Sequence, residues 1–214
     1  MLRKETVSTS TLELLKDLMQ DENLADFFLV GGTALSLQIG HRISIDLDLF
    51  SEKPFDENKM LIYLESKKSF RLDYQDRNTL KGQIAETKVD LISHTYPLVK
   101  PLVVIEEIRL ASLEDIAAMK LNAIIGNGTR LKDFIDVAFL SSYLSLKTMM
   151  KAYEDKYTSR NPLLTLKALA YHQDINFYEP IHIIGGNYIW NAISKRLNEM
   201  EKYPEKVFEK PPFQ

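Results

Sequence analysis

The stretch ISIDLDLF, residues 43–50, alternates apolar and polar residues with a period of two. This alternation is typical of a β-strand with one buried face, and it predicts that the apolar residues of the run point into a core. Ser44, Asp46 and Asp48 then share the opposite face. Two aspartates at i and i+2 on a strand have α-carbons about 6.5–7 Å apart, so their carboxylates can converge on one hard cation.

Two interpretations of this acidic face remain open at this point. Holding two like charges together is costly without a metal, because each carboxylate raises the proton affinity of the other. An Asp-x-Asp pair on its own is better explained as the solvated polar face of an edge strand. The metal-binding hypothesis therefore needs support from other parts of the sequence.

Upstream of this run, the sequence predicts a strand, a glycine turn and a helix in direct succession. Residues 27–30 (FFLV) read as a short buried strand, Gly31 and Gly32 end it, and Thr33 begins a helical stretch that continues to Gln38. Free backbone amides at such a junction allow a phosphate chain to approach the helix N-terminus. An ordinary turn is the alternative interpretation.

A third acid, Asp90, lies in the segment KVDLI at residues 88–92, which also reads as a strand. Its apolar neighbours on both sides predict that the strand is buried. With Asp46 and Asp48, one further carboxylate would complete a metal-binding triad.

The remaining chain predicts strands first and helices later, which indicates an α+β fold. A hydroxyl-rich start at residues 8–11 precedes a helical pattern over 12–19, and a second helix is expected over 56–67. Sheet strands are expected over four further segments: 70–76, 80–85, 88–93 and 102–110. From Ser112 the pattern is helical to Leu140 with a break at 126–128, and a last helix is expected over 188–201.

Composition excludes several classes of site. The 214 residues include no cysteine, which rules out disulfides, thiolate zinc sites and cysteine nucleophiles. The formal net charge of -3 gives no overall attraction to nucleic acid or to a membrane. We see no signal-peptide pattern and no run of eighteen apolar residues, so we expect a cytoplasmic protein without a membrane partner.

Several segments together resemble a known family. They are LVGGTAL at residues 29–35, HRISIDLDLF at 41–50, Lys120 with Ala123 and Arg130, and KDFID at 132–136. In residues and spacing they closely resemble the AbiEii/AbiGii toxin family of nucleotidyltransferases. The resemblance covers about a quarter of the chain.

The resemblance implies a polymerase-beta-like nucleotidyltransferase core, a mixed sheet with flanking helices, followed by a mainly helical C-terminal domain. We expect the core at residues 1–110, a helical domain that completes the active-site cleft at 111–205, and a loose tail at 206–214.

The same resemblance implies roles for individual residues. Asp46 and Asp48 would bind Mg²⁺ beneath the triphosphate, with Asp90 as the third ligand of a two-metal site. The helical domain would add Asp136, as a hydrogen-bonding orienter or as a base. The nucleotide-binding residues expected from the glycine turn, the segment before the acidic run and the helical motif are Gly31, Gly32, Thr33, Arg42, Lys120 and Arg130.

The function implied is a Mg²⁺-dependent transfer of a nucleotide from a nucleoside triphosphate to an RNA, with transfer RNA among the candidates, or to a protein. Pyrophosphate would be released, and a cognate antitoxin would restrain the toxin. The alternative hypothesis is a catalytically silent nucleotide-binding or protein-interaction module that keeps the fold.

Two surface features bear on the acceptor. An RNA would need a local basic groove, and the sequence offers candidates in the helical half: Lys147, Lys151, Lys156, Arg160 and Lys167. The aromatic residues Phe177 and Tyr178, with Tyr188 and Trp190, either stack on a base or pack in the core of the helical domain.

Overall fold

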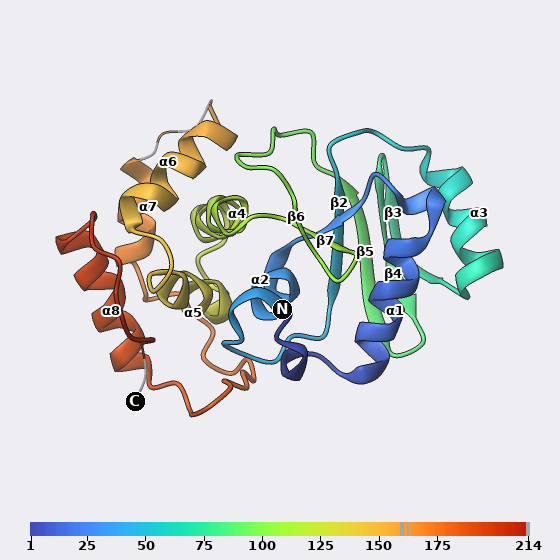
Figure 1. Cartoon of the computed structure of the whole chain (residues 1–214). Helices are drawn as coiled ribbons and strands as arrows, with labels where there is room; N and C mark the ends of the chain where they lie inside the picture. Colours follow the sequence, from blue (N-terminus) through green and yellow to red (C-terminus); the bar gives the residue numbers. More distant parts are fainter. Residues whose placement is uncertain (159–160, 162, 213–214) are drawn as a thin grey trace. The chain divides into compact units, whose positions relative to one another are not determined.

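A computed structural model describes residues 1–158, 161 and 163–212 of the chain (Figure 1). The chain forms two compact units. Unit 1 comprises residues 1–97 and 102–111, and unit 2 comprises residues 98–101 and 112–214. Across the described residues, no helix has the length and apolar character needed to cross a membrane.

Unit 1 is built on a seven-stranded mixed sheet. The strands are β1 (Phe28–Leu29), β2 (Leu47–Ser51), β3 (Arg71–Asp76), β4 (Thr79–Ile84), β5 (Thr87–Ser93), β6 (Val103–Ile105) and β7 (Ile108–Leu110). Their order is β3-β4-β5-β2-β1-β7-β6, with β2 parallel to β5 and β1 parallel to β7. The predicted α+β fold with a mixed sheet and flanking helices is confirmed.

Three α-helices flank this sheet, and two short 3-10 turns adjoin them. They are η1 (Lys4–Thr6), α1 (Thr9–Gln20), η2 (Glu22–Leu24), α2 (Gly31–Ile39) and α3 (Glu57–Lys68). Figure 1 shows α1 and α3 on one side of the sheet and α2 on the other. One face of the central strands is buried, because Leu47, Leu49, Val89 and Leu91 are fully buried, whereas Asp48 and Phe50 on the opposite face of β2 are half-buried.

Side-chain caps fix where several helices begin. Ser8 Oγ accepts from the Thr11 amide at the start of α1, and Asp56 accepts from the Asn58 and Lys59 amides at the start of α3. Such caps satisfy amide donors that have no partner inside the helix. The hydroxyl-rich start at residues 8–11 is thus a capping signal, as its sequence predicts.

The strand predicted over residues 43–50 is wrong at its N-terminal end. Strand β2 begins only at Leu47, and Ile45, which we expected in the core, is 63% exposed. The Ser44 amide donates to the carbonyl oxygen of Thr6, and the Asp46 carbonyl accepts from a threonine hydroxyl. Because these groups bond to loop and helix, residues 43–46 do not pair with a strand.

The single strand expected over residues 102–110 is instead a hairpin of β6 and β7. The turn residues Glu106 and Glu107 have φ angles of 51° and 66°. Two successive residues with positive φ make the tight turn that joins antiparallel strands. Neither residue is the glycine or asparagine that usually signals such a turn, so the sequence pattern missed it.

Arg109 ties β7 to the segment that enters β1. Its guanidinium donates to the carbonyl oxygens of Met19 at 2.7 Å, Phe27 at 2.8 Å and Leu24 at 3.1 Å. Burial lowers the pKa of Arg109 below its ordinary value. Three carbonyl partners in one fork fix the path of the chain into the strand that leads to the glycine turn.

Unit 2 is helical over its described residues. Its helices are α4 (Leu113–Gly126), α5 (Leu131–Leu140), α6 (Leu146–Lys156), α7 (Leu163–Ala170) and α8 (Trp190–Lys202). Helix α4 packs against α5, α6 and α7, and α8 packs against α5 and α7. Ile116, Ala117 and Leu121 on α4 are fully buried, as expected for a helix surrounded by others.

A buried ion pair joins three parts of unit 2. Lys156 Nζ lies 2.8 Å from Asp115 Oδ1, and the same carboxylate accepts from the amides of Val99 and Lys100 and from Ser112 Oγ. Asp115 thus bonds at once to α6, to residues 98–101 and to the start of its own helix. This explains why residues 98–101 belong to unit 2 although β6 and β7 follow them.

The tail expected to be loose from residue 206 is held at Phe208. Its amide donates to the carbonyl oxygen of Ser141, and the Arg196 guanidinium lies 4.2 Å from its ring centroid. Phe208 is buried, so the segment that carries it packs on α8. The last two residues of the predicted tail, 213 and 214, lie outside the described residues.

We predict that Asp115→Asn destabilises the protein strongly. The change removes the carboxylate charge that faces the buried Lys156 ammonium, and breaking one partner of a buried pair costs about 3–5 kcal/mol. The free energy of unfolding from urea denaturation measures the loss. The matched control is Asp155→Asn, which removes an exposed pair with Lys151 and should change stability by less than about 1 kcal/mol. Equal effects of the two substitutions would contradict this account.

Candidate functional site

The glycine turn brings the backbone of Gly31 against a carboxylate. Gly31, the first residue of α2, has a φ of 69°, and a Cβ atom there would lie 2.6 Å from Asp48 Oδ2. The Val30 amide also donates to the Asp48 carbonyl oxygen at 2.9 Å. Glycine is thus required twice, for its left-handed conformation and for the space that Asp48 occupies.

Gly32 makes room for Arg42 in the same way. A Cβ on Gly32 would overlap Arg42 Nη2 and would lie 3.3 Å from Ser44 Oγ. Arg42 is buried, and its Nη1 donates to the carbonyl oxygen of Ile43 at 3.1 Å. The guanidinium therefore lies directly over the first turn of α2.

Thr33 connects the helix to the loop that precedes β2. Its hydroxyl donates to the carbonyl oxygen of Asp46 and lies 2.9 Å from Ser44 Oγ. Thr33 is fully buried. It therefore fixes the backbone beside Asp46, a positioning role that its place in the glycine motif alone does not reveal.

Asp48 and Asp90 lie side by side on neighbouring parallel strands. Asp48 on β2 pairs in register with Asp90 on β5. Paired residues on adjacent strands have side chains on the same face, with backbones about 4.8 Å apart. The sheet therefore brings together two acids that are 42 residues apart in the sequence.

Asp90 lies in an electropositive and mostly buried setting. Its side chain is 5% exposed, and Oδ2 lies 3.1 Å from Lys81 Nζ and 3.9 Å from Lys88 Nζ. Lys81 on β4 is the register partner of Asp90. Among the described residues, the buried Oδ1 has no hydrogen-bond partner. A buried carboxylate oxygen without a donor is costly and is a coordination position for a hard cation.

The three predicted metal ligands are not gathered into one cluster. Across residues 1–158, 161 and 163–212, no three acidic or histidine side chains are close enough together to hold a metal ion. Asp48 and Asp90 form a pair, while Asp46 precedes β2 and is half-buried. The carboxylate oxygens of Asp48 and Asp90, including the unpartnered Oδ1 of Asp90, are suitable ligands for a divalent metal ion.

Unit 2 contains a second charged cluster, around Lys120. Its Nζ lies 2.7 Å from Asp133 Oδ1 and 2.7 Å from Asp136 Oδ2, and all three side chains are buried. Arg130 Nε lies 3.6 Å from Asp133 Oδ2. The predicted residues Lys120, Arg130 and Asp136 are therefore brought together in this unit, with Asp133 at their centre.

The sequence reasoning did not assign two residues of these clusters to a site. Asp133 lies against Lys120 and Arg130, whereas its sequence neighbour Lys132 pairs with Glu179. Asp133 lies three positions after Arg130 and three positions before Asp136. On a helix this spacing places the three side chains on neighbouring positions, which is the sequence pattern that could have assigned Asp133 to the site. No sequence pattern marked Lys81 as a site residue, because only the register of the strands places it beside Asp90.

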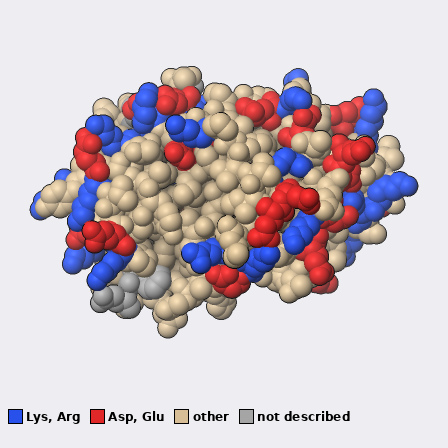
Figure 2. Space-filling model, in the orientation of Figure 1, with Lys and Arg blue, Asp and Glu red and all other residues tan. Residues whose placement is uncertain are grey.

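The predicted basic groove in the helical half is wrong at Lys156, which is buried against Asp115. Lys147 pairs with Glu205 and Lys151 pairs with Asp155. Arg160 lies outside the described residues. Figure 2 shows positive and negative side chains interleaved on the visible face of each unit.

Comparison with known proteins identifies relatives of the chain. Residues 13–97 and 93–201 match the family described as nucleotidyl transferase AbiEii toxin, type IV toxin–antitoxin system. The chain is also 35% identical over 155 residues to the protein aq_aa25 of Aquifex aeolicus strain VF5, whose function is uncharacterised. That match covers 70% of this chain and 75% of the relative.

Two solved structures share the fold. A protein of H. pylori assigned as a nucleotidyltransferase aligns with a TM-score of 0.55 and 19% identity, covering 92% of this chain and 96% of the other. JHP933 from Helicobacter pylori aligns with a TM-score of 0.52 and 19% identity, covering 93% of each chain. Similarity at this level of identity concerns the fold.

We predict that Gly31→Ala destabilises unit 1 and displaces Asp48. A left-handed non-glycine residue costs about 1–2 kcal/mol, and the new methyl group would overlap the Asp48 carboxylate. Urea denaturation measures the stability. Gly126→Ala is the matched control, because no atom lies within 4 Å of a Cβ built there. A Gly31→Ala protein as stable as the control would contradict the close approach.

Proposed function

Because the chain belongs to the AbiEii family of nucleotidyltransferase toxins, we propose that it transfers a nucleotide from a nucleoside triphosphate to an acceptor in a Mg²⁺-dependent reaction that releases pyrophosphate. The resemblance inferred from the sequence is confirmed by the family match. The observation that carries the proposed site is the register of Asp48 with Asp90 beside the Gly31 turn.

We assign metal binding to Asp48 and Asp90, with Asp46 as a further ligand. The support is the paired carboxylates and the unpartnered Oδ1 of Asp90. Two bound metal ions in such enzymes lower the pKa of the attacking hydroxyl and stabilise the leaving pyrophosphate. The contribution of this chain is to hold the carboxylate pair at a fixed spacing on two adjacent strands.

The triphosphate is proposed to approach the start of α2. Gly31, Gly32 and Thr33 form its first turn, where free amides and the helix dipole favour anionic groups. Arg42 lies over this turn and adds positive charge. The space left by the missing Cβ atoms of Gly31 and Gly32 is occupied by Asp48 and Arg42, so a phosphate at this turn would lie beside these two side chains.

Lys120 and Asp136 are proposed to contribute from unit 2. Because Lys120 already lies against Asp133 and Asp136, its positive charge is balanced in this structure. We therefore propose that Asp133 and Asp136 position the Lys120 ammonium, and that Arg130, which is half-exposed, contacts phosphate. The acceptor is proposed to be an RNA or a protein, and the type IV toxin–antitoxin family supports a cognate antitoxin partner.

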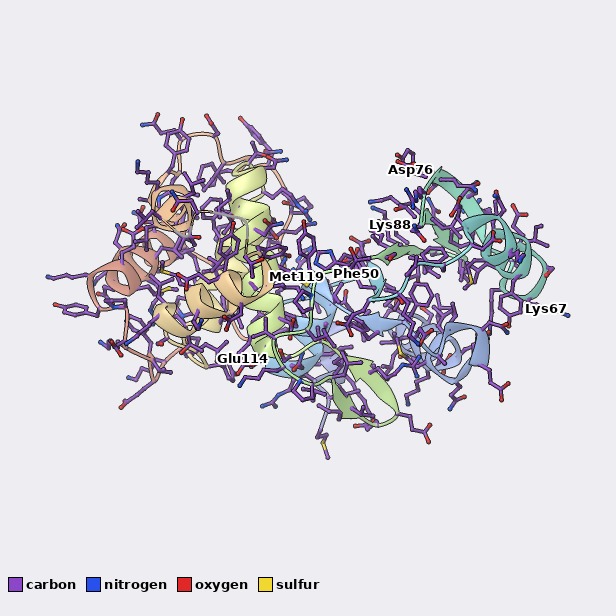
Figure 3. The ribbon with its side chains drawn as sticks, turned by 90° about the horizontal axis from the view of Figure 1, so that it is seen from above. Phe50, Lys67, Asp76, Lys88, Glu114 and Met119 are labelled. Atoms are coloured by element: carbon purple, nitrogen blue, oxygen red, sulfur yellow. The ribbon has the colours of Figure 1, made fainter. Side chains whose placement is uncertain are left out.

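We predict that Asp48→Asn abolishes transfer. The protein is incubated with Mg²⁺, each α-labelled nucleoside triphosphate in turn, and total RNA or cell extract, and label on a macromolecule is measured. Asp76→Asn is the matched control. Figure 3 shows Asp76 on the outer strand β3, away from Phe50 of β2, and its side chain is exposed. We expect loss of label only with Asp48→Asn.

Two other outcomes of this experiment carry information. Unchanged labelling by Asp48→Asn would remove Asp48 from the site. If nucleotide binds but no acceptor in the extract is labelled by the unsubstituted protein, the silent nucleotide-binding module becomes the better description. The balanced charge of Lys120 is the observation that favours this second candidate.

We also predict that Lys81→Met tightens Mn²⁺ binding. Lys81 attracts Asp90 and repels a cation placed there, and each 1.4 kcal/mol of competing interaction removed is about tenfold in affinity. Electron paramagnetic resonance of free Mn²⁺ measures the binding. Lys88→Met, whose Nζ lies at 3.9 Å, should have a smaller effect, and Asp90→Asn should weaken binding. Mn²⁺ affinity unchanged by Lys81→Met would argue against a metal at Asp90.

A further inference from the structure

A row of apolar side chains lies next to the carboxylates of Asp48 and Asp90, on the same face of the sheet. Phe50 follows Asp48 by two residues on β2, so the two side chains share a face and their α-carbons are about 6.5–7 Å apart. Phe50 pairs in register with Ile92 of β5 and with Phe28 of β1. Three adjacent strands therefore place apolar side chains one strand repeat from the carboxylates.

Two more rings continue from Phe50 beyond the end of β5. The His94 amide donates to the Ser51 carbonyl oxygen at 2.8 Å, which keeps the chain beside β2 after β5 has ended. The His94 ring centroid lies 5.0 Å from that of Phe50 and 4.8 Å from that of Tyr96, with interplanar angles of 35° and 47°. These distances are typical of interacting ring pairs. Phe50, His94 and Tyr96 thus form one continuous aromatic row.

The rings of the aromatic row pack on one another but are not sealed from solvent. Tyr96 is 38% exposed, and Phe50 and His94 are half-buried. The opposite face of β2 consists of Leu47 and Leu49, which are fully buried. The aromatic row therefore lies on the open face of the sheet and not in its core, and it retains ring surface that a planar ligand can cover.

The direction of the chain orders three features of this face along β2. The antiparallel pairing of β1 with β2 places Phe28 opposite Phe50. Two residues further on, the Val30 amide donates to the Asp48 carbonyl oxygen, and α2 begins at the next residue. The chain thus moves away from Phe50 as it approaches α2. The start of α2 and the aromatic row therefore lie on opposite sides of Asp48.

We propose that the aromatic row binds the nucleobase of the nucleoside triphosphate by stacking. This inference rests on the proposed function, which assigns the triphosphate to the start of α2 and the metal ions to Asp48 and Asp90. The nucleoside of a nucleotide bound in this way lies on the side away from α2, where the open face carries Phe50, His94 and Tyr96. Every nucleobase has a π face that can stack on such rings.

An RNA acceptor would be a second source of the same ring chemistry, because its terminal base also has a π face. The donor is favoured because its base is joined covalently to the phosphates that the metal ions would hold. Its distance from the carboxylates is therefore limited to one nucleoside, and the aromatic row begins one strand repeat from Asp48. Separate binding measurements with the two ligands distinguish these sources.

The test measures binding of the α,β-methylene analogues of ATP, GTP, CTP and UTP to the full chain with Mg²⁺, by isothermal titration calorimetry. The methylene group replaces the oxygen whose bond to phosphorus breaks in transfer, so the ligand stays intact. For each analogue that the unsubstituted protein binds, we expect Tyr96→Ala to weaken binding at least about fivefold, the low end for loss of one stacked base. Tyr96→Phe should retain binding, and Tyr96→Leu, which has no ring, should bind as weakly as Tyr96→Ala.

Inorganic tripolyphosphate separates stacking from loss of structure. It has the charge of the triphosphate without a base, so it should bind Tyr96→Ala and Phe50→Leu as well as it binds the unsubstituted protein. A variant that disturbed β5 would displace Asp90 and weaken the binding of both kinds of ligand. Tyr74→Ala is the matched control, because it removes a 51% exposed tyrosine from the outer strand β3. It should leave the affinity for both ligands unchanged.

Four results would overturn the proposal. They are no binding of any analogue by the unsubstituted protein, unchanged analogue affinity in Tyr96→Ala, an equal loss of tripolyphosphate affinity in that variant, and full rescue by Tyr96→Leu. If Tyr96→Ala weakened binding of a fluorescein-labelled single-stranded RNA and spared the analogues, the row would belong to the acceptor, which would also reject the donor assignment.

Failure of the proposed function gives a different pattern from failure of this inference. Analogue binding that depends on Tyr96, without any transfer of label, would reject the enzymatic role and sustain the base-binding row. Transfer that requires Asp48, with analogue binding that is indifferent to Tyr96, would sustain the enzymatic role and reject the row.

Discussion

The register of β2 against β5 is the constraint on which the rest of unit 1 depends. It places Asp48 beside Asp90 on the same face of two adjacent strands, where two like charges repel. Groups around the two carboxylates offset this repulsion. Lys81 and Lys88 approach one carboxylate, and the backbone of Gly31 makes room for the other. A sheet with any other register would separate the acids from these partners.

Unit 2 also buries charged side chains, but there each buried lysine is paired with carboxylates. Lys120 is buried between Asp133 and Asp136, and Lys156 is buried against Asp115. In both clusters an ammonium group is matched to carboxylates on neighbouring turns or helices. Buried pairs of this kind add little net stability over apolar packing, but they penalise every arrangement that leaves a charge unpaired. They therefore select one packing of the helices.

The sequence predicted the fold class and most elements, because hydrophobic periodicity and helix caps are local signals. It also predicted that Asp48 and Asp90 belong together, through a resemblance in residues and spacing. It failed where tertiary bonds override local pattern, as at Ile45, which alternates like a strand residue but lies outside β2. It could not reveal Lys81 or the partners of Asp133, since contacts across strands and helices depend on register and packing that no short window contains.

The path of the chain between the two units has a consequence for synthesis. The polypeptide leaves unit 1 at residue 97, contributes residues 98–101 to unit 2, returns for β6 and β7, and enters unit 2 again at residue 112. On the ribosome, the amides of Val99 and Lys100 emerge well before Lys156, which completes the cluster around Asp115. The two amides therefore have no carboxylate partner until Asp115 has been synthesised, and the buried ion pair forms only after Lys156. The order of synthesis therefore favours completion of the strand core before the helices close.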